Sequence, residues 1–444
     1  MMGQGQGHGE PSSRVEDAGA QAPPAARTYD VFIVHAADDE AFVQGYLVPS
    51  LGLTPDRVLV PRALEPGRFV LGEIERGVCA SRVTVVVLSR AYLHDHWAVF
   101  GEQIAAFASL ARERDAVFLP VLRDDCELPL HVQALVALDF RNAAPSRWQA
   151  EVERLRSFLG AASTTLPGLP CPYPGMRPFQ QADAGQFFGR DVEIERIVRR
   201  LRRGEREIYV IGASGSGKSS LIAAGLLPRL ALGVDGLPRF EVRSVRPCEH
   251  PVDRLAAAIG GDVAAPGAAP GAMIEALLAD PAAVLLLVVD QLEELFASAS
   301  EEQRARFFAA IRALRGAPRC ALVFTLRADF YGAFMESPLW TDRDGAISRV
   351  DLGPLSSQEL RMVIERPARN AGVHLEPELV SRLLDDAARE PGALPLLQET
   401  LFRLWGKRRQ RLLALADYHA MSDGQRSGLA FAVKEHADDV VSGL

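Results

Sequence analysis

The sequence has very little lysine. Three of its 49 basic residues are lysines, and arginine takes nearly every other basic position. Lys218 stands alone over the first 406 residues, and the next lysine is Lys407. A lone lysine in such a chain marks a position where the wide, forked guanidinium of arginine would not serve.

Cysteine is scarce, and long apolar runs are missing. The five cysteines lie far apart and form neither a metal-ligand spacing nor a disulfide framework, so we expect a reducing, cytoplasmic compartment. The longest apolar run, Ala282 to Val289, is far shorter than the ~20 residues of a membrane-spanning helix, and it predicts a buried parallel strand instead. We therefore expect no membrane contact. The net charge of −8 gives no reason to expect nucleic acid as a partner.

The first part of the chain predicts a compact parallel α/β domain over residues 28–160. Residues 1–27 are rich in Gly, Pro, Ala and Ser and are predicted to be disordered. Apolar, β-branched runs then alternate with helical patterns. The predicted strands are 30–34, 58–60, 82–88, 117–122 and 135–140. The predicted helices are 38–49, 70–79, 97–112 and 145–159.

A second α/β series follows a proline-rich stretch, residues 161–178, that we interpret as a linker. Its strands are predicted near 207–212, 239–245, 284–290, 319–326 and 347–352, which places a nucleotide-binding core at 179–354. From residue 356 to 412 the pattern is helical, so we expect a helical lid subdomain at 355–415. Residues 416–444 would begin a further, truncated helical segment.

The stretch GASGSGKS matches the phosphate-binding loop pattern G-x-x-x-x-G-K-[ST] in full. Glycines let backbone N–H groups curl around phosphates at a helix N-terminus. Lys218 would reach the β and γ phosphates, and Ser219 would offer its hydroxyl to Mg²⁺. The predicted nucleotide contacts are Gly212, Ser214, Gly215, Ser216, Gly217, Lys218, Ser219 and Ser220.

Two later strands end in candidate partners of this loop. Asp290 ends an apolar strand and is expected to hold Mg²⁺, directly or through water. Glu293 and Glu294 follow; one of them could orient the attacking water, or both could be solvated acids in the first turn of a helix. Arg327, after the next strand, could sense the γ-phosphate or form a surface pair with Asp329.

The second half of the chain resembles the STAND class of signalling ATPases, most of all its bacterial novel STAND NTPase group. The segments that carry the resemblance are PYPGMRPFQ, FFGRDVEIERIV, GASGSGKSSLIAAGLLPRL, VVDQLEELF, TLRADFYG and PGALPLLQETL. The resemblance implies that Phe188, Gly189 and Arg190 lie near the adenine, and that Pro395 stands at the base of a lid that closes over ATP or ADP. Relatives usually continue into a winged helix and a repeat sensor, so we expect a fragment, with the sensor or trigger outside this chain.

The first domain resembles a TIR domain, which implies a flavodoxin-like fold. The matching segments are YDVFIVHAADDE, RALEPGRF and IERGVCASRVTVVVLSRAYLHDHW. Some TIR domains cleave NAD⁺ with a glutamate four residues after the tryptophan, but here that position is Gly101. The nearest acid is Glu102, which is either the catalytic carboxylate or a solvated acid in the first turn of a helix.

Together these features predict an immune or stress signalling protein. ATP binding would drive homo-oligomerisation, slow hydrolysis would reset the switch, and the clustered TIR domains would hydrolyse NAD⁺. Two alternatives remain: a TIR scaffold without NADase activity, controlled by the ATPase, and an ATP-driven remodelling ATPase.

Overall fold

The computed structural model describes residues 28–61, 76–94, 117–126, 136–141, 144–161, 168–263, 265, 268–342, 347–390, 392–421 and 429. The predicted disordered N-terminus and the predicted helix 97–112, with Glu102, lie outside these ranges. The chain divides into two compact units. The first comprises residues up to Ala36, Leu53–Arg141 and Ser157–Gly160, and the second comprises Ala37–Gly52, Asn142–Arg156 and Ala161–Leu444.

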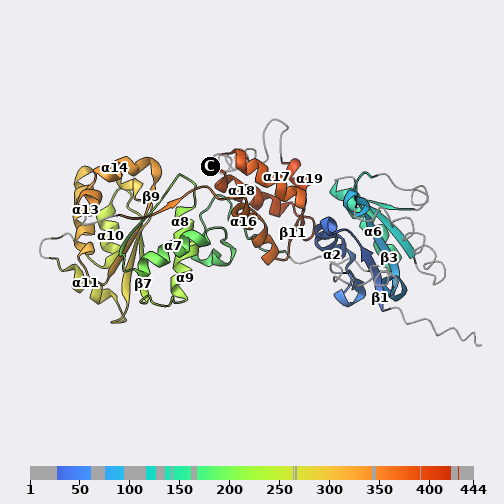
Figure 1. Cartoon of the computed structure of the whole chain (residues 1–444), viewed down its shortest axis with the longest axis horizontal. Helices are drawn as coiled ribbons and strands as arrows, with labels where there is room; N and C mark the ends of the chain where they lie inside the picture. Colours follow the sequence, from blue (N-terminus) through green and yellow to red (C-terminus); the bar gives the residue numbers. More distant parts are fainter. Residues whose placement is uncertain are drawn as a thin grey trace, which may run out of the picture. The chain divides into compact units, whose positions relative to one another are not determined.

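A five-stranded parallel sheet forms the first unit (Figure 1). Its strands are β1 (Tyr29–Val34), β2 (Val58–Leu59), β3 (Ser81–Leu88), β4 (Val117–Leu122) and β5 (Leu138–Asp139). They lie in the order β2-β1-β3-β4-β5, which is the flavodoxin-like order. Residues 83–88 are all buried, as expected for a central strand with both faces covered. The predicted flavodoxin-like fold class is confirmed.

A second five-stranded parallel sheet forms the core of the second unit. Its strands are β6 (Glu207–Gly212), β7 (Phe240–Val245), β8 (Val284–Val289), β9 (Cys320–Arg327) and β10 (Ser348–Leu352). The order is β10-β6-β9-β8-β7, so β6, the strand that leads into the GASGSGKS stretch, lies in the interior of the sheet. Along β6, Ile208 and Val210 join one buried cluster, whereas Tyr209 and Ile211 join another. The period of two therefore gives the sheet a separate apolar core on each face.

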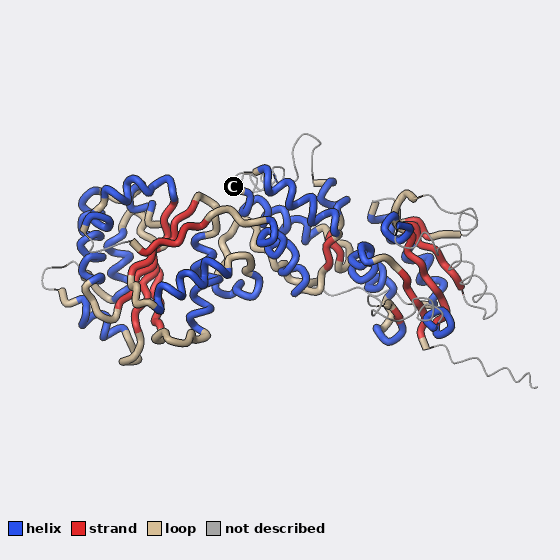
Figure 2. Tube along the Cα trace, in the orientation of Figure 1, coloured by secondary structure: helices blue, strands red, loops and turns tan. Residues whose placement is uncertain are grey.

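Helices cover both faces of this sheet, as the tube trace shows (Figure 2). One face carries α7 (Asp191–Arg202), α8 (Lys218–Ser220), the π-helical turn η5 (Leu221–Leu226) and α9 (Leu227–Ala231). The other carries α10 (Pro251–Ile259), α11 (Pro270–Leu277), α12 (Glu293–Ala297), α13 (Glu301–Arg315), α14 (Tyr331–Glu336) and α15 (Pro338–Thr341). In the described ranges, no helix is long and apolar enough to cross a bilayer.

The region after residue 356 is mostly helical, as predicted. It contains α16 (Ser357–Asn370), α17 (Pro377–Arg389), α18 (Ala393–Gly406) and α19 (Leu415–His419). The prediction of an all-helical segment missed one feature: β11 (His374–Leu375) and β12 (Leu412–Leu413) pair as a small parallel sheet. Strands of two residues are too short to show an alternating pattern in the sequence.

Part of the predicted linker packs into this helical core. Tyr173 is 1% exposed and lies in the same apolar cluster as Leu397 and Trp405. The indole Nε1 of Trp405 donates a hydrogen bond to the carbonyl oxygen of Leu169, 3.2 Å away. The described residues 168–178 are therefore held by the helical subdomain.

The second unit also includes Ala37–Gly52 and most of helix α6 (Pro145–Leu159). The first of these segments contains η1 (Ala37–Asp39), α1 (Glu40–Phe42), η2 (Val43–Leu47) and α2 (Val48–Leu51). Within this unit the guanidinium of Arg409 lies over the ring of Trp148, 4.5 Å from its centroid. The backbone N–H of Arg411 donates to the carbonyl oxygen of Gly45 at 2.8 Å. Two helical segments from early in the chain thus contact the turn before β12.

Candidate nucleotide-binding site

The GASGSGKS stretch forms a tight loop between β6 and α8. Gly215 and Gly217 have φ values of 72° and 90°, a region that glycine enters at little cost. A Cβ on Gly212 would lie 2.6 Å from the hydroxyl oxygen of Ser216 and 3.0 Å from the carbonyl oxygen of Leu352. The glycines therefore permit both the left-handed turns and the close approach of the chain to itself.

Lys218 is buried at the start of the helix, with 7% of its surface exposed. Its ammonium donates to the carbonyl oxygens of Gly212 (3.0 Å) and Ala213 (2.8 Å). Burial lowers the pKa of Lys218, and the nearby carboxylate of Glu293 works in the opposite direction. Because these partners are backbone oxygens, a phosphate can replace them without leaving a carboxylate unpaired.

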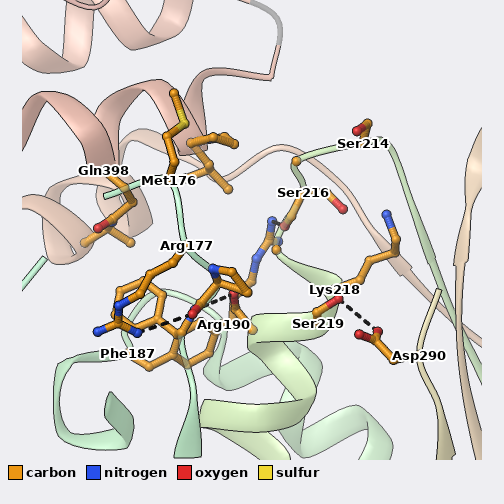
Figure 3. A pocket seen from close by; sticks show the side chains of 18 of the residues that line it. Met176, Arg177, Phe187, Arg190, Ser214, Ser216, Lys218, Ser219, Asp290 and Gln398 are labelled. Atoms are coloured by element: carbon orange, nitrogen blue, oxygen red, sulfur yellow. Dashed lines mark hydrogen bonds between the residues drawn. The ribbon is translucent and has the colours of Figure 1, made fainter. Parts of the chain in front are cut away.

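Three elements converge on Asp290, directly after β8. The hydroxyl of Ser219 donates to Asp290 Oδ1 at 2.9 Å, and the two side chains point toward each other (Figure 3). Thr325 from β9 donates to the same oxygen at 2.6 Å and accepts from the backbone N–H of Gln291 at 2.8 Å. Gln291 itself has a φ of 57°, an uncommon value for a non-glycine residue. Strained backbone of this kind is concentrated at functional sites.

The two candidate glutamates occupy different environments. Glu293 is buried, and its Oε2 accepts a hydrogen bond from the backbone N–H of Arg327 at 3.1 Å. Glu294 instead pairs with Arg246 and accepts from the thiol of Cys248 at 3.2 Å. Glu293 lines the cavity together with Lys218, so it is the acid that the structure brings beside the phosphate loop.

Arg327 pairs with Asp329 and also lines the cavity, so a contact with the γ-phosphate stays a prediction. Its Nε lies 3.1 Å from Asp329 Oδ1. The hydrogen bond to Asp329 raises the pKa of Arg327 above its ordinary value.

The far end of the cavity is built by the segment before α7 and by the helical subdomain. Arg190 is buried, lines the cavity and donates to the carbonyl oxygens of Ser216 and Gly353, both at 3.0 Å, so it ties the phosphate loop to the segment after β10. Gly189 has a φ of 83°, and a Cβ there would lie 3.0 Å from the carbonyl oxygen of Glu359. The structure therefore places Arg190 in the cavity wall, and its expected position near the adenine stays a prediction.

The helical subdomain also contributes to the cavity. Pro395, in the first turn of α18, lies 3.0 Å from the Cβ that Gly215 lacks. Gln398, one turn later, faces the cavity from the same helix (Figure 3). Ser220 also lines the cavity, and its hydroxyl accepts a hydrogen bond from the backbone N–H of Phe179 at 3.1 Å. Ser214 and Phe188 also line the cavity.

The cavity fits a nucleotide with Mg²⁺. Its volume is about 430 Å³, within the ordinary range for a small-molecule site. Three buried polar atoms on its wall have no hydrogen-bond partner among the described residues: Ser216 Oγ, Gln186 Oε1 and Gln398 Oε1. Buried polar atoms are normally satisfied, so these atoms indicate a polar ligand. Ser219 and Asp290 supply the hydroxyl and carboxylate oxygens that Mg²⁺ prefers.

The sequence pattern placed Thr325 with Arg327 at the end of a strand but did not show its contact with Asp290, and no motif includes Arg246. Thr325 fixes Asp290, and Arg246 lines the cavity beside it. Arg246 directly follows β7, Thr325 lies two residues before the end of β9, and Asp290 directly follows β8, the strand between them. Polar residues at the ends of parallel strands gather at one edge of a sheet, but which strands are neighbours is a property of the fold.

Two domain families match the chain. The family described as TIR domain matches residues 31–156, and the family described as Novel STAND NTPase 1 matches residues 172–444. Among curated proteins, Toll-like receptor 13 of Mus musculus is 33% identical over 100 residues, which is 22% of this chain and 10% of the receptor. Toll-like receptor 4 of Sus scrofa is 29% identical over 100 residues, 22% of this chain and 12% of that receptor. The chain thus spans about a tenth of the length of these relatives.

Solved structures give matches to each half. The TIR domain of the Toll-related receptor TRR-2 from Hydra magnipapillata is 23% identical, with a TM-score of 0.25, over 30% of this chain and 99% of that one. The Aeropyrum pernix ORC1 protein in complex with DNA is 20% identical, with a TM-score of 0.41, over 58% of this chain and 68% of that one. The predicted resemblances are confirmed by the family matches: with more than half of its length matched, this chain belongs to the Novel STAND NTPase 1 family and carries a TIR domain ahead of the NTPase.

Proposed function

We propose that the chain is a nucleotide-switched signalling effector. ATP binding at the phosphate loop drives homo-oligomerisation, and the assembled TIR domains hydrolyse NAD⁺ to release nicotinamide. The observation that carries the proposal is one chain with two parts: a TIR domain, and an NTPase whose Lys218, Ser219 and Asp290 line one cavity. The matched curated relatives are named as Toll-like receptors, which supports a role in signalling.

The residues of the cavity divide the work of binding and hydrolysis. Lys218 exchanges its two backbone partners for phosphate oxygens, and Ser219 and Asp290 hold Mg²⁺. A Mg²⁺ ion held there would neutralise charge on the phosphates. Thr325 keeps the Asp290 carboxylate turned toward Ser219, and Glu293 orients the attacking water. With Glu294 engaged elsewhere, we propose slow hydrolysis that resets a switch.

NAD⁺ cleavage is tested with the full chain and its Glu102→Ala variant. We expect nicotinamide release that depends on added ATP, is lost in Glu102→Ala, and is also lost in Lys218→Ala because that variant cannot assemble. Binding of ATP with no nicotinamide release would favour the scaffold, and release that Glu102→Ala leaves unchanged would contradict the catalytic role of Glu102. Steady ATP turnover on the order of 10 s⁻¹ would favour a remodelling motor over a switch.

A further inference from the structure

Arg246 lies at the phosphate end of the cavity, although no motif includes it. Strands β7 and β8 pair in parallel register, with Val245 opposite Val289. Arg246 directly follows β7 and Asp290 directly follows β8, so the two residues lie side by side at the same edge of the sheet. Arg246 lines the cavity together with Asp290 and Lys218.

The guanidinium of Arg246 is held by Glu294 on α12. Its Nε donates to Glu294 Oε1 at 2.7 Å, and Nη2 donates to the same oxygen. The thiol of Cys248 donates to the other oxygen, Oε2, at 3.2 Å. Partial burial alone would raise the pKa of Glu294, but the hydrogen bonds from Arg246 and Cys248 hold it below its ordinary value. Both carboxylate oxygens are therefore committed to the β7–α10 segment.

Cys248 is placed for this contact at some conformational cost. Its φ is 50°, a value that few residues without the freedom of glycine adopt. Burial, and then the Glu294 carboxylate, raise the pKa of the Cys248 thiol, so at neutral pH the thiol keeps the proton that it donates. The surrounding structure therefore maintains this uncommon backbone conformation, which directs the Cys248 thiol toward the Glu294 carboxylate.

The hold on Arg246 is nevertheless weak enough to be released. The Arg246 side chain is 53% exposed and that of Glu294 is 21% exposed, and an ion pair with a solvent-exposed partner contributes little. Arg327 pairs with its near neighbour Asp329, and Lys218 rests on backbone oxygens. Arg246 is thus a cation at the phosphate end whose partner, Glu294, lies on a different element and remains hydrogen-bonded to Cys248 if the guanidinium leaves.

We propose that Arg246 is a phosphate-contacting residue that moves from Glu294 to the terminal phosphate of a nucleoside triphosphate, and so sets the preference for ATP over ADP. This inference rests on the proposed nucleotide-binding function. A diphosphate lacks the terminal phosphate and leaves Arg246 on Glu294. Cys248 keeps Glu294 in place, so Arg246 can return after hydrolysis.

The test compares Mg²⁺-dependent binding of ATP and ADP to the full chain and to Arg246→Gln. We expect ATP affinity to fall about ten- to one-hundred-fold, the range for loss of a charged hydrogen bond, while ADP affinity stays within about two-fold. Arg229→Gln is the matched control. It removes another exposed Arg–Glu pair, with Glu195, from outside the cavity lining and should change neither affinity.

A second variant tests the hold itself. Glu294→Gln removes the carboxylate but keeps Arg246, so we expect the ratio of ATP to ADP affinity to rise several-fold. Retained ADP binding in Arg246→Gln shows that the pocket is folded. If Arg246→Gln binds ATP as the unsubstituted chain does, or weakens ATP and ADP equally, the inference is wrong and the proposed function stands. If the unsubstituted chain binds neither nucleotide, both are wrong.

Discussion

At the scale of single residues, the orientation of Asp290 depends on two hydroxyl groups from different elements. Ser219 comes from the phosphate loop, and Thr325 comes from the neighbouring strand β9. Thr325 is fully buried and also accepts from the backbone N–H of Gln291. This one side chain therefore fixes both the carboxylate and the strained peptide that follows it.

Replacing Thr325 with valine should impair the Mg²⁺-dependent step. Valine has nearly the same shape, but it leaves Asp290 with one fewer donor and the Gln291 N–H without its acceptor. We expect ATP hydrolysis to fall about ten-fold, the effect of losing a charged hydrogen bond. Thr325→Ser keeps the hydroxyl and should retain most of the rate. Equal activity in Thr325→Val and the unsubstituted chain would show that Asp290 needs no support from β9.

The residues of the phosphate loop could be predicted from sequence because their chemistry lies within eight consecutive positions. Asp290 was predicted because it ends an apolar strand at a typical distance. Arg246 was not, because its position beside Asp290 depends on β7 pairing with β8, and strand order is a property of the fold. The same limit applies to the two glutamates. Their spacing made Glu293 and Glu294 equal candidates for orienting the water, and only their contacts with other elements distinguish them.

At the scale of elements, α16 begins with a reciprocal cap. The hydroxyl of Ser356 accepts from the backbone N–H of Glu359 at 3.3 Å, and the backbone N–H of Ser356 donates to Glu359 Oε2 at 2.7 Å. The serine hydroxyl also donates to this oxygen at 2.8 Å. These backbone and side-chain bonds from Ser356 hold the pKa of Glu359 below its ordinary value. The cap fixes where the helical subdomain starts after the last core strand.

Ser356→Ala should lower the free energy of unfolding of this subdomain by about 1 kcal/mol at pH 7, the usual loss for a removed cap. The folded-state pKa of Glu359 is lowered from its ordinary value of 4.5. The ionised carboxylate therefore makes its full contribution to stability above pH 4.5, and this contribution is lost as the pH falls through the folded-state pKa. The difference between the variant and the unsubstituted chain should therefore shrink in urea titrations at pH 3. Ser357→Ala, one position inside the helix, is the control. A difference that is the same at both pH values would show that the bond from the Ser356 hydroxyl to the Glu359 carboxylate contributes nothing to the cap.

The strands were easier to predict than their surroundings. The run Arg82–Leu88 is apolar and β-branched, and β3 begins one residue earlier. Helix α6 has the predicted bounds, Pro145–Leu159. The burial of Tyr173 in the proline-rich stretch could not be predicted, because composition indicates a lack of regular secondary structure but not which side chains pack against the core.

At the scale of the whole molecule, the second unit joins segments from both ends of the described chain. Gly45 in η2 meets the turn before β12 so closely that an added Cβ would lie 2.8 Å from the carbonyl oxygen of Arg411 and 3.1 Å from His374 Cβ. Trp148 lies against Tyr46 with ring centroids 4.8 Å apart, and Arg409 lies over the same indole. Burial raises the pKa of Tyr46 to about 12, so the phenol stays neutral beside the guanidinium.

This contact predicts a specific effect of Gly45→Val on hydrogen exchange. The backbone N–H of Arg411 donates to the carbonyl oxygen of Gly45, and a valine side chain would collide with a backbone oxygen that cannot rotate away. We expect exchange at the Arg411 amide to accelerate at least ten-fold, while amides of β6 and β9 keep their protection. Gly168→Val is the matched control, because a Cβ there meets nothing within 4 Å. If Arg411 exchanges at the same rate in Gly45→Val and in the unsubstituted chain, the segment 37–52 does not depend on β12 for its place. The second unit would then have to be described without that segment.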